Sequence, residues 1–255
     1  MPIGCREARA AQLWEARAAQ LWENSGSVIV ITGIYYAAAL VAAGAIVWWL
    51  AAPWAAIPLW VLALFCLYFF RDPERQIPSG PVAVSPADGK VVAVKAESPT
   101  QNRISIFLSV FDVHVNRTPI GGTIAKVQYQ KGAFHVASKE ECSVQNEQNV
   151  VTVQGDGTTV VFKQIAGLIA RRIVFDRRRG DRVAMGERIG LIKFGSRCDV
   201  LLGPEWEITV RPGMRVAGGS SIIARRRGQG QAGRVQAGQV QAGQGQAGQD
   251  QPNVA

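Results

Sequence analysis

Residues 27–70 read SVIVITGIYYAAALVAAGAIVWWLAAPWAAIPLWVLALFCLYFF, and this stretch contains no Lys, Arg, Asp, Glu or His. The 28 Lys and Arg residues and the 19 Asp and Glu residues all lie on either side of it. A helix needs about 20 apolar residues to cross roughly 30 Å of hydrocarbon, so 28–50 is long enough and 54–70 is marginal. The sequence therefore predicts a membrane segment over 28–70, followed by a water-soluble body.

The membrane segment has the pattern of a helical hairpin. Pro53 and Pro58 suit a turn and the first turn of a second helix, where proline is tolerated. Tyr68 would lie near one interface, and four tryptophans near the other: Trp48, Trp49, Trp54 and Trp60. Two alternatives stay open, namely a single span with an interfacial second segment and a helix pair buried in a soluble core. A cleaved signal peptide does not fit, because the apolar block is too long.

Arginines flank the segment on both sides, and positive flanks stay in the cytoplasm. They are Arg6, Arg9 and Arg17 before it, and Arg71 and Arg75 after it. We therefore expect the soluble body on the cytoplasmic face of the cell membrane. The net charge of +9 favours an anionic membrane surface as partner. Nucleic acid is not expected, because no basic motif is interleaved with aromatic residues.

Both ends of the chain differ in composition from its middle. Residues 1–27 contain a duplicated octapeptide, Glu7–Trp14 and Glu15–Trp22, which predicts a peripheral helical arm. Residues 225–255 repeat Gln-Ala-Gly without apolar anchors and predict a disordered tail. The four cysteines form no C-x-x-C, so neither a disulfide nor a metal site is expected.

Residues 71–224 carry short runs rich in Val, Ile, Phe and Thr that are cut by Gly, Pro, Asp and Asn. Such runs predict strands, and helical periodicity is scarce apart from an undecided stretch at 169–172. We expect a compact, mainly-β domain of sandwich or barrel-like form after the hairpin. The expected strands are Val82–Val84, Lys90–Ala96, Arg103–Ser109, Thr123–Gln130, Val150–Val153, Thr158–Ile165, Ile189–Phe194, Asp199–Leu202 and Trp206–Val210.

Gly195-Ser196, between two expected strands, indicates self-cleavage chemistry. The serine hydroxyl lies beside the preceding carbonyl, and glycine has no Cβ to crowd its approach. Asp88 and His114 would complete a set of carboxylate, imidazole and hydroxyl that activates a nucleophile if the fold brings them together. Each has a blander interpretation, Asp88 as a turn residue before Gly89 and His114 as a hydrogen-bonded strand histidine.

Several spaced motifs resemble the phosphatidylserine decarboxylases in their short bacterial and archaeal form. The resemblance covers about residues 60–224, and the preceding hairpin agrees with that family's arrangement. The motifs are Tyr68-Phe-Phe-Arg-Asp-Pro-Glu-Arg75, Ser85-Pro-Ala-Asp-Gly89, Asp112-Val-His-Val-Asn-Arg117, Asn146-Glu147, Gln164-Ile-Ala-Gly-Leu-Ile-Ala-Arg-Arg172 and Lys193-Phe-Gly-Ser-Arg-Cys-Asp199.

The resemblance implies a proenzyme that cuts itself between Gly195 and Ser196 and converts Ser196 into a covalent pyruvoyl cofactor. The two resulting chains would stay together, and a homo-oligomer is allowed. The pyruvoyl ketone would take phosphatidylserine as a Schiff base and release phosphatidylethanolamine and CO2. Asp88 and His114 would assist the cleavage, and His114 would also hold the substrate carboxylate or return a proton.

The chain departs from the family's larger members at three places. They carry a second histidine three residues after the one that matches His114, and Arg117 stands there in this chain. His135 occupies a position where an apolar residue is expected. The duplicated arm and the Gln-Ala-Gly tail have no counterpart, and no function is assigned to them.

Two other functions are weighed against the decarboxylase. The first is a membrane-tethered serine hydrolase that uses Ser196, His114 and Asp88 with the chain intact. It would need a strained turn into a helix, whereas 197–200 has the pattern of a strand. The second is a non-catalytic β module that binds anionic lipid through Arg171-Arg172 and Arg177-Arg178-Arg179.

Overall fold

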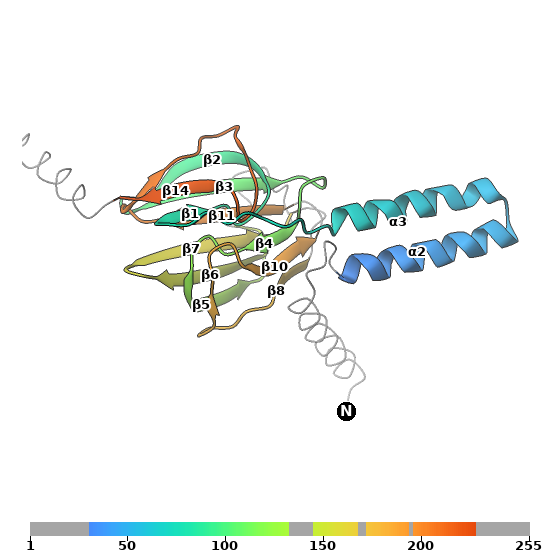
Figure 1. Cartoon of the computed structure of the whole chain (residues 1–255), viewed down its shortest axis with the longest axis horizontal. Coiled ribbons are helices and arrows are strands. Elements are labelled where there is room, and N and C mark those ends of the chain that lie inside the picture. The colour runs from blue at the N-terminus through green and yellow to red at the C-terminus, as the bar shows by residue number, and fades with distance from the viewer. Residues whose placement is uncertain (1–30, 133–144, 168–171, 194–195, 228–255) are drawn as a thin grey trace, which may run out of the picture.

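The computed structural model describes residues 31–132, 145–167, 172–193 and 196–227. Two antiparallel helices project from one end of a β-rich body (Figure 1). The expected arm, most of the expected tail, Gly195 and His135 lie outside the described residues. The architecture confirms the expected fold class, an apolar helical segment followed by a mainly-β domain.

The projecting pair consists of α2 (Ile31–Leu50), a short 3₁₀ turn η1 (Pro53–Ala56) and α3 (Ile57–Phe69). The helices run antiparallel, since Gly33 lies against Phe70 at one end and Gly44 against Trp60 at the other. Here the absent Cβ allows close approach, because a Cβ on Gly44 would lie 2.3 Å from the Trp60 indole nitrogen. The proline turn that the sequence predicts is therefore present.

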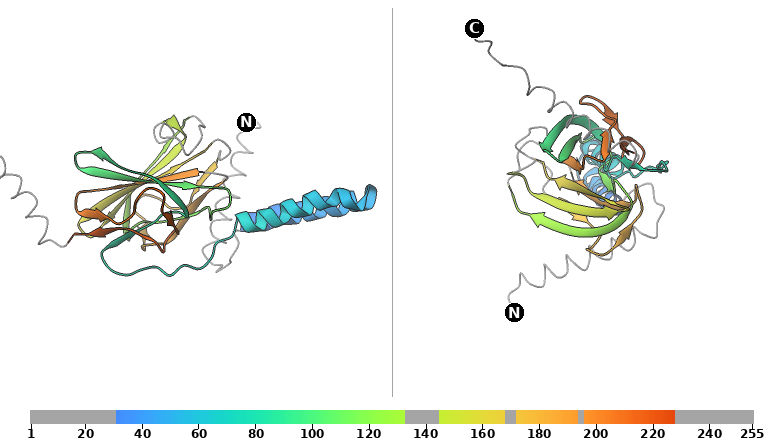
Figure 2. Two further views of the ribbon diagram at one scale, coloured as in Figure 1. Left: turned by 90° about the horizontal axis from the view of Figure 1, so that it is seen from above. Right: turned by 90° about the vertical axis from the view of Figure 1, so that its left-hand side faces the viewer.

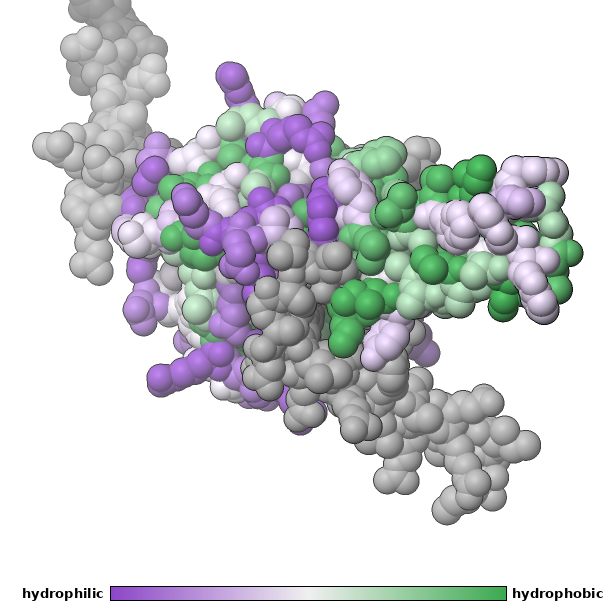
Figure 3. Space-filling model, turned by 45° about the vertical axis from the view of Figure 1, so that its right-hand side comes forward, coloured by the Kyte–Doolittle hydropathy of each residue, from purple (hydrophilic) through white to green (hydrophobic). Residues whose placement is uncertain are grey.

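Most of the surface of the helix pair is apolar and uncovered. Only 17% of the most apolar stretch of α2 is buried, and that helix is long and apolar enough to cross a membrane. α3 is shorter, with 13 residues. Apolar side chains cover the projecting part in Figure 3, in contrast to the mixed polar surface of the body. This exposure contradicts the alternative of a helix pair buried in a soluble core.

The body contains fourteen described strands in three antiparallel sheets. Their bounds are β1 (Val82–Val84), β2 (Gly89–Ser98), β3 (Gln101–Leu108), β4 (Val115–Arg117), β5 (Gly122–Gln130), β6 (Gln148–Gly155), β7 (Thr158–Ile165), β8 (Arg172–Phe175), β9 (Arg182–Val183), β10 (Arg188–Lys193), β11 (Ser196–Leu202), β12 (Trp206–Ile208), β13 (Arg215–Val216) and β14 (Ile222–Arg226). The large sheet has the order β13-β2-β3-β11-β7-β6-β5-β9, and the small sheets are β1-β14-β12 and β4-β10-β8.

The large sheet is curled (Figure 2). Residues of β14 in a small sheet pack against residues of its concave face to form the main core. Alternate residues of its strands supply apolar side chains to this face, as the two-residue period of a strand requires. Ile104, Phe162 and Val200 are fully buried there, and Ala224 and Ile223 of β14 close the core from the small sheet. Placing β11 at the centre of the large sheet fixes the position of Ser196.

The two ends of the large sheet are similar in sequence. Arg179-Gly-Asp-Arg-Val-Ala-Met-Gly-Glu and Arg211-Pro-Gly-Met-Arg-Val-Ala-Gly-Gly each contribute a two-residue strand, β9 and β13, and these are the two edge strands. In each, the later glycine turns the chain with positive φ, 74° at Gly186 and 77° at Gly219. A Cβ at either position would press on Ile77. Both turns therefore contact the linking segment, residues 70–81, which joins α3 to β1.

That linking segment is held to the body by buried ion pairs. The carboxylate of Asp72, 1% exposed, binds Arg117 of β4 at 2.7 Å and also Arg188 of β10. Three residues later Arg75 pairs with Asp88 at 2.8 Å. Arg117 of β4 is thus engaged with the linking segment.

Several strand boundaries differ from the expected ones. β11 begins at Ser196, three residues before the expected strand, and β8 occupies the C-terminal end of the undecided stretch at 169–172, the rest of which is not described. β14 continues through Arg226, two residues into the range expected for the tail. Five strands are absent from the expected set: β4, β8, β9, β13 and β14. β9 and β13 are only two residues long.

Candidate active site

Ser196 is the first residue of β11 and is completely buried. It pairs with Leu108 of β3, and by alternation it faces the concave side of the sheet together with Cys198. Its hydroxyl oxygen makes no hydrogen bond with the described part of the chain. A buried hydroxyl without a partner costs about 1–3 kcal/mol, so such a group invites a chemical explanation.

A row of amide side chains lies one step further along the same face, and the sequence did not single it out. Asn149 Nδ2 donates to Gln164 Oε1 at 3.1 Å, and Gln164 Nε2 donates to Asn116 Oδ1 at 2.9 Å. The row orients the last amide, because an oxygen that accepts from Gln164 leaves the Asn116 NH₂ group facing the Cys198 sulfur at 3.6 Å. The available sequence signal was a polar residue in phase with the apolar Val160 and Phe162 along β7.

His114 lies just before β4 with its imidazole buried. Its Nδ1 is 2.9 Å from the backbone carbonyl of Asp112, and a carbonyl can only accept, so Nδ1 carries the proton. The Phe69 ring at the end of α3 covers the imidazole at a centroid distance of 4.2 Å. Desolvation by burial lowers the pKa of His114 from 6.5 to about 4, against an opposing effect of Asp112 and with a smaller contribution from the charge of Arg71. At neutral pH His114 is therefore uncharged, with Nε2 as the basic nitrogen.

Asp88 is in the turn before β2, and its carboxylate is engaged away from the histidine. It accepts two hydrogen bonds from Arg75, at 3.0 and 2.8 Å, and one from the backbone N–H of Gly218 at 2.7 Å. The side chain is 18% exposed. The carboxylate is thus committed to the linker and to the turn after β13.

One apolar cluster connects the surroundings of the three candidates. The cluster consists of Ala87, Leu108, Ile192 and Cys198, with Ile173 packed against it. Ala87 precedes Asp88, Leu108 is the cross-strand partner of Ser196, and Ile192 donates its N–H to the carbonyl of His114 at 3.3 Å. The fold thus brings the candidates to the same end of the body, to which α3 is attached. It does not form a hydrogen-bonded triad, because the Ser196 hydroxyl has no partner among the described residues.

The opposite face of β11 carries buried charges. Arg197 donates to Asp199 at 2.7 Å and to the hydroxyl of Ser105 at 2.6 Å, and Arg103 lies 3.4 Å from Asp199. Arg197 is 1% exposed and Asp199 is fully buried. These pairs allow a strand to start at Ser196 despite its charged composition, and they fix the backbone beside the candidate nucleophile.

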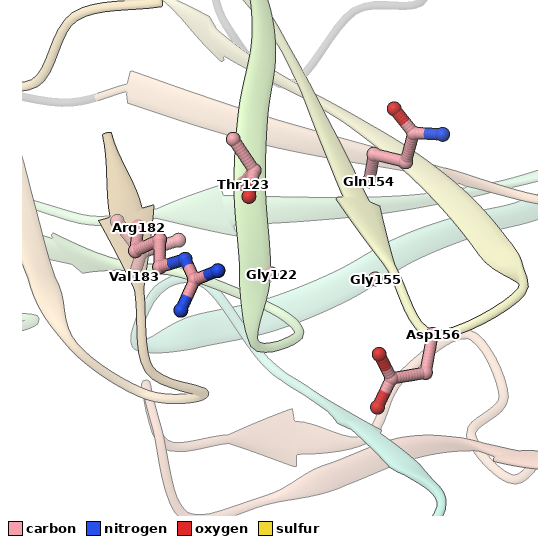
Figure 4. A pocket seen from close by; sticks show the side chains of 7 residues that line it. All are labelled: Gly122, Thr123, Gln154, Gly155, Asp156, Arg182 and Val183. Carbon is pink, nitrogen blue, oxygen red and sulfur yellow. The ribbon is translucent and has the colours of Figure 1, made fainter. Parts of the chain in front are cut away.

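A pocket elsewhere on the body is unrelated to these residues (Figure 4). Its volume is about 360 Å³, and it lies between the end of β6 and the beginnings of β5 and β9, at the far end of the sheet from Ser196. Its lining residues are Gly122, Thr123, Gln154, Gly155, Asp156, Arg182 and Val183. Across the four described segments no group of three or more His, Cys, Asp or Glu residues could hold a metal ion.

Among the described arginines of the lipid-binding alternative, Arg178 and Arg179 are exposed and Arg177 is engaged in an ion pair. Arg177 pairs with Glu187 at 3.0 Å, and it follows the end of β8 that points away from Lys193. Arg171 and the side chain of Arg172 lie outside the described residues, as do Phe194 and Gly195. The thiol of Cys198 is fully buried, which raises its pKa, and Cys198 is unpaired with any other described cysteine.

The lowered pKa of His114 predicts a pH dependence of stability. An unfolded histidine takes up its proton near pH 6.5 and the folded one near 4, so the unfolded chain binds more protons between these values. Folding should therefore lose about 3 kcal/mol as the pH falls through this window. Chemical unfolding in detergent between pH 7 and 4 should show this loss for the wild type and a flatter profile for His114→Gln. Parallel profiles for the two proteins would show that His114 is not buried in its neutral form.

The structure defines a class of β-rich proteins with an apolar helix pair at one end and a fully buried serine inside a sheet. Comparison with known proteins identifies the class further. A sequence profile described as phosphatidylserine decarboxylase matches residues 62–224. The chain belongs to the phosphatidylserine decarboxylase family.

Three relatives show how far the similarity extends, and each is named phosphatidylserine decarboxylase proenzyme. The protein of Solibacter usitatus is 77% identical over 198 residues, which are 78% of this chain and 97% of the relative. That of Cupriavidus taiwanensis is 42% identical over 202 residues, 76% of this chain and 91% of the relative. That of Burkholderia cenocepacia is 47% identical over 174 residues, 66% and 81% respectively.

Proposed function

We propose that this chain is a proenzyme that cuts its own Gly195–Ser196 bond and then decarboxylates phosphatidylserine to phosphatidylethanolamine. The observation that carries the proposal is the Ser196 hydroxyl, which is fully buried, without a partner among the described residues and adjacent to a glycine carbonyl in the chain. Family membership supports the same reaction. Nothing in the described surroundings of this hydroxyl competes for its attack on the preceding carbonyl.

The proposed self-cleavage has three chemical steps. The Ser196 oxygen attacks the Gly195 carbonyl carbon and displaces the Ser196 nitrogen, which turns the amide into an ester. Loss of the Ser196 Cα proton then breaks the Cβ–O bond, leaving a carboxylate on Gly195 and a dehydroalanine at 196. Water replaces the nitrogen of dehydroalanine, ammonia leaves, and a pyruvoyl group begins the second chain. The pyruvoyl group at position 196 would supply an electrophilic ketone that takes up the electrons of the departing carboxylate.

The residues around Ser196 support these steps by proton transfer and by exclusion of water. Neutral His114, with Nε2 unprotonated, is the base available at this end of the body. The oriented NH₂ group of Asn116, on β4 of the small sheet, is a neutral donor that faces Cys198 on the Ser196 side of the large sheet. Asp88 supports the site indirectly in this structure, because its carboxylate holds Arg75 and the Gly218 turn. An apolar, uncharged environment favours the loss of a carboxylate.

The helix pair supports a membrane location for the proposed reaction. α3 ends beside the site, and Phe69 covers His114. A lipid headgroup at the point where the helices join the body is therefore near the candidate residues. We extend the proposal to a cytoplasmic location of the body, supported by the arginines on both sides of the uncharged segment.

The test is the intact mass of full-length protein purified in detergent, together with lipid analysis. We expect two polypeptides, 1–195 and 196–255, the second with a pyruvoyl group in place of its amino-terminal serine. Borohydride should add two hydrogens to that terminus and abolish the release of CO2 from phosphatidylserine. An unbroken chain that still releases CO2 would overturn the proposal. An unbroken chain that instead hydrolyses the lipid would favour a serine hydrolase, although Ser196 and His114 share no hydrogen bond in the described part of the chain.

A further inference from the structure

The turn between β3 and β4 carries an exposed aromatic side chain at the root of the helices. Phe111, whose residue is 63% exposed, is in the middle of the turn Ser109–Asp112. A large exposed apolar side chain three residues from a buried candidate histidine suggests that something binds over it. Two sets of contacts, one to α3 and one within the turn, show where this side chain is held.

The first set attaches the turn to the last turn of α3. The carbonyl of Phe111 accepts hydrogen bonds from the Tyr68 hydroxyl at 3.2 Å and from Arg71 at 2.7 Å. Arg71 also binds the carbonyl of Tyr68 at 2.8 Å, and its guanidinium lies 3.8 Å from the centre of the Tyr68 ring. Phe111 is therefore held at the depth at which α3 leaves its apolar surroundings, and a tyrosine and an arginine are typical of that level of a bilayer.

The second set makes the turn rigid and neutralises its acidic residue. The Asp112 carboxylate accepts from the backbone N–H and the hydroxyl of Ser109, each at 2.8 Å, and pairs with Arg215. The Asp112 N–H donates to the Ser109 carbonyl at 3.0 Å. The backbone on which Phe111 stands is thus fixed, and the negative charge next to it is compensated.

We propose that the Phe111 turn is an interfacial anchor that inserts into the lipid headgroup region and sets the entrance of the site against the bilayer. The occupant is the lipid surface, because the turn continues the exposed apolar surface of α3, where Leu64 is 67% and Tyr68 46% exposed. His114 follows two residues after the turn, so a headgroup at Phe111 is presented to the active-site end of the body. The kinetic consequence of this inference rests on the proposed function. The insertion of Phe111 into the lipid does not depend on it.

Insertion is tested by a photoreactive benzoylphenylalanine placed at Phe111 in the full-length protein, reconstituted in vesicles of phosphatidylcholine and phosphatidylserine. We expect crosslinks to lipid from position 111. The same group at Asp156, in an exposed turn at the far end of the body, is the control and should give none. Absence of lipid crosslinks at 111, or crosslinks to a second protein copy in their place, would overturn the proposal. This readout does not require the protein to be cut or active.

The kinetic arm compares vesicle-borne phosphatidylserine with a short-chain phosphatidylserine dispersed as monomers. Phe111→Ser should raise the apparent KM for the vesicle substrate by about fivefold, with kcat and self-cleavage unchanged, because the anchor loses apolar area. The short-chain substrate should show no change, and Phe111→Trp should restore the vesicle KM. Equal losses on both substrates would assign Phe111 a purely structural role and overturn the proposal.

Discussion

Replacing Ser196 with alanine is expected to leave one uncut chain of 255 residues that releases no CO2 from phosphatidylserine. Alanine removes the only side-chain oxygen of residue 196 that can attack the Gly195 carbonyl, so neither the ester nor the later pyruvoyl group can form. The body should stay folded, because the lost hydroxyl makes no hydrogen bond with the described residues and its removal relieves an unsatisfied buried group. Denaturing electrophoresis, intact mass and lipid analysis measure the three parts of this result.

A matched control is available on the same strand. Cys198 is two residues further along β11, faces the same side and is also fully buried. Burial raises the pKa of its thiol, so it stays neutral and is a poor nucleophile. Cys198→Ser should therefore be cut as the wild type is. A Ser196→Ala chain that is still cut after Gly195 would refute the assignment of the nucleophile, as would an uncut but active wild type.

Replacing Asp72 with asparagine should cause the largest loss of stability among substitutions in the linker. Asp72 is 1% exposed and compensates two arginines, of which Arg117 is itself 7% exposed. Burial lowers the pKa of Arg117 and Asp72 opposes this effect, so the carboxylate is what keeps that charge acceptable inside the protein. Breaking such a pair on one side costs about 3–5 kcal/mol. Chemical unfolding in detergent at neutral pH measures the change.

Two further variants separate the loss of charge compensation from a general disturbance of the linker. Glu74→Gln removes a carboxylate that is 77% exposed and 3.4 Å from Arg188, so its effect should stay within about 1 kcal/mol. Adding Arg117→Met to Asp72→Asn removes the stranded charge and should recover part of the lost stability. If the double variant is as unstable as the sum of the single ones, the pair does not act as described.

The uncharged run 27–70 and the alternating strands predicted the architecture, because both patterns report burial directly. Thr158–Ile165 and Val82–Val84 agree with β7 and β1 at both ends. β11 begins earlier than expected because the charges of Arg197 and Asp199 neutralise one another inside the protein. Charged residues are usually exposed, so composition alone does not predict this buried ion pair. The two-residue strands β9 and β13 exist only because the ends of the large sheet accept them.

The candidate site was predictable in its chemistry and unpredictable in its partners. Residue types with distinctive reactivity singled out Ser196, His114 and Asp88. The Asn116–Gln164 contact joins residues 48 positions apart, and Asp72 binds Arg117 across 45, so both depend on the packing of elements that periodicity does not reveal. The carboxylate of Asp88 was expected to assist the serine, and it binds Arg75 and Gly218.

The position of β11 and β14 has a consequence for the mature molecule. The segment after residue 195 supplies β11 between β3 and β7, β13 beside β2, and β14 between β1 and β12. Once the bond is cut, strands of each polypeptide lie between strands of the other, and neither polypeptide contains a complete hydrophobic core by itself. The proposed self-cleavage would therefore change the covalent connectivity within a finished tertiary structure, and the two pieces should unfold together as one cooperative unit.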